Sequence, residues 1–100
     1  MKKKIDITIC VLNYNCGEMT RRCLESIRNL TVDVSLEIIV VDNKSTDNSI
    51  SILSKLNNIT LIQAEYNCGF SRGNNIALKK ASGKYCILLN PDTILKNNAL

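Results

Sequence analysis

The chain contains no histidine and no tryptophan, and it has a single proline among its 100 residues. Without histidine, a structural zinc site is not expected, and a cysteine nucleophile would lack its usual activating base. The number of cysteines is odd and no two have CxxC spacing, which argues against a disulfide framework. We interpret them as reduced, mostly buried thiols of a cytosolic protein. They are Cys10, Cys16, Cys23, Cys68 and Cys86.

Long hydrophobic runs and strong charge are also missing. No stretch approaches the roughly 18 apolar residues of a membrane span. The basic start is followed by a segment that Asp6, Thr8 and Asn13 interrupt, which does not fit a signal peptide. The net charge of +4 is mild, and the sequence has no basic face with interleaved aromatic residues. Nucleic-acid binding is therefore not expected. A hydrophobic fraction of 45% instead favours one globular domain, or part of one, over residues 1–100.

Hydrophobic periodicity alternates between strand and helix along the whole chain. Short β-branched or apolar runs predict strands over residues 5–12, 36–41, 59–63 and 84–89. Helical spacing predicts helices over 18–29, 47–56 and 71–82, with Ser71 as the N-cap of the last. In the first helix we expect Met19, Cys23, Ile27 and Leu30 to face inward. This order predicts parallel strands joined by right-handed crossovers.

Polar residues follow the predicted strands, where an open parallel sheet binds its ligands. Asn13-Tyr14-Asn15 follows the first strand, Asp42-Asn43 the second and Asn90-Pro91-Asp92 the fourth. The sequence has neither GxGxxG after its first strand nor a GxxxxGK[ST] loop, which argues against a dehydrogenase and a P-loop NTPase. A non-catalytic nucleotide-binding module and a receiver-like interaction domain remain alternatives. A receiver, however, needs paired acids where this chain has amides.

Four segments in order resemble the N-terminal half of the family 2 glycosyltransferases. They are ICVLNYN at 9–15, IVVDNKSTD at 39–47, NCGF at 67–70 and LLNPD at 88–92. The Asn-Pro-Asp element is most similar to the rhamnosyltransferase-like branch that builds bacterial surface polysaccharides. The resemblance implies an inverting enzyme of the three-layer, Rossmann-like GT-A fold, with a parallel sheet of strand order 3-2-1-4. It also implies a UDP- or dTDP-sugar donor and a saccharide or lipid-linked acceptor.

The resemblance assigns nucleotide contacts to polar residues at the strand ends. Asp42 would accept a hydrogen bond from the imide N–H of uracil or thymine. Arg72 would pair with the diphosphate, and Gly69 would permit a tight or left-handed backbone. The full set of expected donor-binding residues is Asn13, Asn15, Asp42, Asn43, Gly69, Arg72, Asn74 and Asn90.

The same resemblance makes Asp92 the ligand of a divalent cation, Mg²⁺ or Mn²⁺. Asn90 replaces the first carboxylate of the family's Asp-x-Asp element and offers only a neutral oxygen. No residue before Leu100 matches the catalytic base, so we expect the chain to be a truncated, donor-binding half that is inactive alone. We also expect the fourth strand to form an apolar edge that favours a homodimer. Peripheral association with the inner face of the membrane is expected for the full-length protein.

Overall fold

The computed structural model describes residues 4–29, 35–67 and 69–91, and within them strands and helices alternate as expected. The elements in chain order are β1 (Ile7–Asn13), α1 (Gly17–Arg28), β2 (Leu36–Asp42), α2 (Ser49–Leu53), β3 (Thr60–Gln63), α3 (Gly69–Lys80) and β4 (Tyr85–Leu89).

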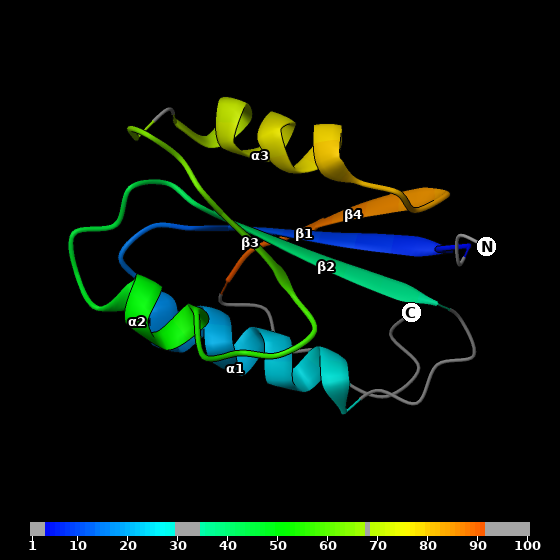
Figure 1. The fold of residues 1–100 in the computed structure, drawn as a ribbon, viewed down its shortest axis with the longest axis horizontal. Helices are drawn as coiled ribbons and strands as arrows, with labels where there is room; N and C mark the ends of the chain where they lie inside the picture. The colour runs from blue at the N-terminus through cyan, green and yellow to red at the C-terminus, as the bar shows by residue number, and fades with distance from the viewer. Residues whose placement is uncertain (1–3, 30–34, 68, 92–100) are drawn as a thin grey trace.

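All four strands are parallel, in the order β3-β2-β1-β4, which confirms the predicted topology. The chain moves outward from β1 through β2 to β3, and then returns to the other side of β1 for β4. Because each crossover is right-handed, this reversal changes the face on which the connecting helix lies. Accordingly α1 and α2 cover one face of the sheet and α3 covers the other (Figure 1).

The core consists of two apolar layers, one on each face of the sheet. The larger layer fills the space between the sheet and the helices α1 and α2. Its buried members are Ile9, Val11, Cys23, Leu24, Ile27, Ile38, Val40 and Leu53. The smaller layer lies under α3 and consists of Cys10, Ile39, Val41 and Ala77. The central strands β1 and β2 are therefore buried on both faces, as their nearly continuous apolar sequences require.

The helices differ from the sequence-based prediction in register and length. Met19 is 48% exposed, whereas Thr20 takes the inward position beside Cys23 and Leu24. Helix α2 spans only Ser49–Leu53, and the N–H groups of Thr46 and Asp47 just before it donate to Asn15. Helix α3 begins at Gly69, so the prediction that Ser71 is its N-cap is wrong.

Strand β4 lies at the sheet edge next to β1, but it is more exposed than its apolar sequence suggested. Tyr85 is 62% and Leu88 48% exposed. Leu88 is paired with Cys10 and therefore faces the α3 side of the sheet, where α3 packs mainly over β1 and β2, whereas Tyr85 points to the opposite face at the start of the strand. The expected apolar edge strand is therefore present, although its apolar sequence alone would also fit a buried strand.

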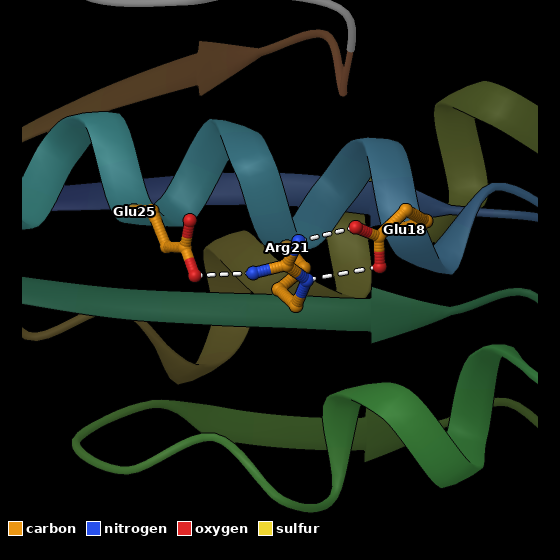
Figure 2. A network of polar contacts seen from close by, with 3 residues as sticks. All are labelled: Glu18, Arg21 and Glu25. Carbon is orange, nitrogen blue, oxygen red and sulfur yellow. Dashed lines mark hydrogen bonds and ion pairs between the residues drawn. The ribbon is translucent and has the colours of Figure 1, made fainter.

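The outer face of α1 carries a small ionic network. Figure 2 shows the Arg21 guanidinium between the carboxylates of Glu18 and Glu25, one turn away on either side. Glu18 therefore pairs with Arg21 at i,i+3, and Arg21 pairs with Glu25 at i,i+4. The hydrogen bond from Arg21 lowers the pKa of Glu18 and raises that of Arg21. Since all three groups face water, the network marks a solvated helix face rather than a functional site.

Candidate functional site

The carboxyl ends of β1 and β2 bring the predicted polar residues together at one rim of the sheet. Asn13 and Asp42 are direct neighbours in the register of the two strands. The loops that follow them lie at the same end of the sheet as the start of α3, on the left in Figure 1. An open α/β sheet presents its ligand site at this end.

Asn13 is completely buried, and its amide is fully hydrogen-bonded. The amide nitrogen donates to Asp42 Oδ1 at 2.8 Å and to Ser45 Oγ at 3.2 Å. The amide oxygen accepts from the Thr20 hydroxyl at 2.6 Å and from the Cys16 thiol at 3.4 Å. Two donors and two acceptor sites exhaust what an amide offers, so this side chain fixes its neighbours and has no capacity left for a ligand.

Asp42 is 1% exposed and is held by three donors. Its Oδ1 accepts from Asn13 and, at 2.6 Å, from the hydroxyl of Ser45. Its Oδ2 accepts from the backbone N–H of Ser45 at 2.9 Å. A carboxylate has about four acceptor positions. By this count Oδ2 has one acceptor position that none of these three donors fills.

Asn15 connects the loop after β1 to the loop after β2. Its amide oxygen accepts from the backbone N–H groups of Thr46 and Asp47 at 2.7 and 3.2 Å. Its own N–H donates to Ser45 Oγ at 2.9 Å. The residue has φ 52°, a left-handed conformation that asparagine tolerates better than most residues. The two loops consequently form one hydrogen-bonded unit.

The start of α3 is attached to the same unit. Asn43 donates from its backbone to Asn13 O at 2.8 Å and from its side chain to Gly69 O at 3.2 Å. Gly69 has φ +82°, so the predicted left-handed backbone at this glycine is confirmed. The N-terminus of α3 thus lies over the end of β2.

Two predicted residues of α3 lie outside this network. Asn74 is 6% exposed, and its amide nitrogen has no hydrogen-bond partner among the described residues. Arg72 is exposed and lines a cavity of about 670 Å³ between α3 and the segment after β3. The other lining residues include Glu65, Tyr66 and Lys79. The residues that line this cavity do not include those of the hydrogen-bonded loops at the ends of β1 and β2.

The predicted cation site depends on a residue outside the described part of the chain. Asp92 lies beyond it, whereas Asn90 is exposed immediately after β4, with its backbone oxygen 3.9 Å from Cys23 Sγ. Residues 4–29, 35–67 and 69–91 contain no cluster of three potential metal ligands.

Burial raises the pKa of Cys10 to about 11, so this thiol stays protonated near neutral pH and is a poor nucleophile.

The sequence did not single out Ser45 and Thr20 as site residues. Ser45 joins Asn13, Asn15 and Asp42, although in the sequence it resembled an ordinary turn residue. Thr20 could have been found as a polar residue at the inward helical spacing of Cys23, Leu24 and Ile27. A buried hydroxyl at such a position needs a hydrogen-bond partner, and here that partner belongs to the site.

An open parallel sheet covered by helices on both faces, with a hydrogen-bonded polar rim at its topological switch, defines a Rossmann-like α/β protein. Comparison of the sequence with known protein families identifies the family within this fold class. Residues 8–100 match the family model described as glycosyl transferase family 2, and the chain belongs to that family.

Individual relatives and solved structures agree with this assignment. A poly(ribitol-phosphate) beta-glucosyltransferase of Bacillus spizizenii is 37% identical over 97% of this chain and 16% of its own length. The structure of S. aureus TarS 1-349 in complex with UDP has a TM-score of 0.79 and 28% sequence identity to this chain. The match covers 88% of this chain and 28% of the TarS chain.

A mannosyltransferase from Pyrobaculum calidifontis, PcManGT, solved with GDP-Man and Mn²⁺, has a TM-score of 0.80 and 25% identity over 90% of this chain and 28% of its own. The chain spans between a tenth and about a third of the length of the curated relatives it matches.

Proposed function

We propose that this chain forms the donor-binding half of a glycosyltransferase. The reaction is the inverting transfer of a sugar from a UDP- or dTDP-sugar to a saccharide or lipid-linked acceptor, in the synthesis of bacterial surface polysaccharide. The observation that carries the proposal is the hydrogen-bonded rim at the ends of β1 and β2, which leaves one acceptor position on Asp42. Family membership and the nucleotide complexes of TarS and PcManGT support it.

The chemistry of the rim fits a pyrimidine with an imide N–H. In our proposal the remaining acceptor position of Asp42 Oδ2 receives that N–H. Asn13 has no capacity left for the nucleotide and acts by holding Asp42 in place. Asn15, Asn43 and Gly69 shape the loops around the ligand. The buried, unpartnered amide nitrogen of Asn74 is available to an acceptor oxygen of the donor.

A divalent cation completes the proposed donor site. Asn90 can contribute only a neutral amide oxygen, so the carboxylate that a Mg²⁺ or Mn²⁺ ion needs must come from Asp92. When bound, such an ion neutralises charge on the diphosphate leaving group. Arg72 adds a second positive charge for the diphosphate in this proposal, provided that its exposed side chain turns from the cavity toward the rim.

The test is calorimetric titration of this chain with UDP and with dTDP, each with and without Mn²⁺. We expect binding that Mn²⁺ strengthens, and we expect Asp92→Ala to lose that gain. Glu25→Ala serves as the control, because Glu25 is an exposed carboxylate on the outer face of α1. Metal-independent binding would favour a non-catalytic nucleotide-binding module. The absence of binding to a folded chain would contradict the proposal.

We also propose that the β4 edge mediates self-association of this chain. The strand presents Leu88 and Tyr85 at an edge that no described strand pairs with. Light scattering across a concentration series should show a dimer that Leu88→Lys dissociates. Leu78→Lys is the matched control, because Leu78 is similarly exposed but belongs to α3. A monodisperse monomer at every concentration would contradict the proposal.

Cellular location stays a prediction. None of the helices in the described part of the chain is long and apolar enough to cross a bilayer. The expected cytoplasmic location and the peripheral membrane association of the full-length protein are consistent with a lipid-linked acceptor, which would place the transfer at a membrane surface.

A further inference from the structure

We propose that Thr20 is a positioning residue that sets the base selectivity of the donor site through Asn13 and Asp42. The inference rests on the proposed nucleotide-binding function and deepens it. Thr20 lies on α1, its side chain has no exposed surface, and it is separated from Asp42 by the amide of Asn13. It would therefore act without touching the ligand.

The first step concerns the hydroxyl of Thr20. It lies on the buried face of α1, in line with Cys23, Leu24 and Ile27, where an apolar side chain would otherwise pack. A buried hydroxyl without a partner is costly, and this one donates to Asn13 Oδ1 over 2.6 Å. The only other donor to that oxygen in the described structure is the thiol of Cys16 at 3.4 Å, and thiols are weak donors.

The second step concerns the orientation of the Asn13 amide. Asp42, when ionised, can only accept hydrogen bonds, so the nitrogen end of the amide has to face it. The oxygen end then faces α1, and Thr20 supplies the strong hydrogen bond that keeps it there. If this bond is lost, the amide is held firmly at one end only. The amide can then tilt about its nitrogen end, which changes the direction in which that nitrogen meets Asp42 Oδ1.

The third step leads to the ligand. With Asn13 and Ser45 both bonded to Oδ1 and the Ser45 N–H bonded to Oδ2, Asp42 presents one acceptor position in one direction. A fixed acceptor favours uracil, which has an N–H at position 3, over cytosine, which has an unprotonated nitrogen there. A carboxylate that can rotate loses part of this discrimination, because the match depends on direction as well as on charge.

The experiment compares UDP with CDP, each titrated in the presence of Mn²⁺. We expect Thr20→Val to weaken UDP binding about tenfold, with little change for CDP, so that the UDP-to-CDP affinity ratio falls. Thr20→Ser retains the hydroxyl and should restore the ratio to within about threefold of the wild type. Thr20→Ala provides a second variant without the hydroxyl if the valine does not fit.

Ile27→Val is the control for destabilisation, because Ile27 is buried on the same helix face and makes no polar contact with the site. It should leave the ratio unchanged. An unchanged ratio in both Thr20→Val and Thr20→Ala, while Asp42→Asn abolishes selectivity, would overturn the inference and leave the proposed function standing. If the folded wild type binds no UDP, the proposed function fails, and the inference fails with it.

Discussion

Replacing Asp42 by alanine is expected to destabilise the protein by about 3 kcal/mol and to abolish UDP binding. The carboxylate receives three hydrogen bonds in a buried position, from the Asn13 amide and from the N–H and hydroxyl of Ser45. A buried donor that loses its acceptor costs about 1–3 kcal/mol, and at least two of these donors have no described alternative. For a domain of this size, the loss corresponds to a fall in Tm of roughly 12–24 °C.

The measurement is thermal and urea denaturation of the variant beside Asp47→Ala. Asp47 belongs to the same loop and carries the same charge, but it is exposed, and the partner that its carboxylate shares with the start of α2 is Ser49. Its replacement should cost about 1 kcal/mol, as the loss of a typical helix-capping side chain does. If Asp42→Ala is no more destabilising than Asp47→Ala, then Asp42 does not anchor the rim.

The sequence predicts well where the site lies in the fold and which backbone conformation one of its glycines adopts. Asn13 and Asp42 were expected at one rim, because parallel strands end at the same edge of a sheet, and the register pairs them directly. Gly69 was expected to permit a tight or left-handed backbone, and its φ of +82° is left-handed. The strand ends and the glycine can be located from local sequence patterns, and one topological rule for parallel sheets then places the strand ends at the same edge.

Other features depend on contacts between segments that are distant in sequence. Hydrophobicity alone places Met19 inward, but the buried position belongs to Thr20 because Asn13 needs a donor from α1. Helix α2 is shorter than its sequence predicts, and the N–H groups of Thr46 and Asp47 before it donate to Asn15 in the neighbouring loop. Neither the inward position of Thr20 nor these hydrogen bonds between loops can be read from local propensity, because both depend on partners that are distant in sequence. Both changes lie at the site, where local and global preferences most often conflict.

Gly17→Ala is a second change with a large expected effect on stability, and whether it stabilises or destabilises the protein is informative. Alanine is favoured over glycine by about 1 kcal/mol inside a helix, so an open position in α1 would gain stability. At Gly17 a Cβ atom would lie 2.6 Å from Ser49 Cα and 2.9 Å from Ser49 Oγ. Since a backbone atom cannot turn aside as a side chain can, α1 and α2 have to separate. We therefore expect a net destabilisation of about 1–3 kcal/mol, as overpacked cores show.

The displacement should also reach the nucleotide site. Gly17 N–H donates to Ser49 Oγ at 2.9 Å, and the N–H of Ser49 donates to Asp47 Oδ1 at the same distance. Asp47 N–H in turn donates to Asn15, so a shift of Ser49 pulls on the loop that holds Asp42. Denaturation and UDP titration of Gly17→Ala beside Met19→Ala, an exposed position in the same helix, test this chain of contacts. A variant that is more stable than the wild type and binds UDP normally would show that α1 and α2 can separate without disturbing the rim.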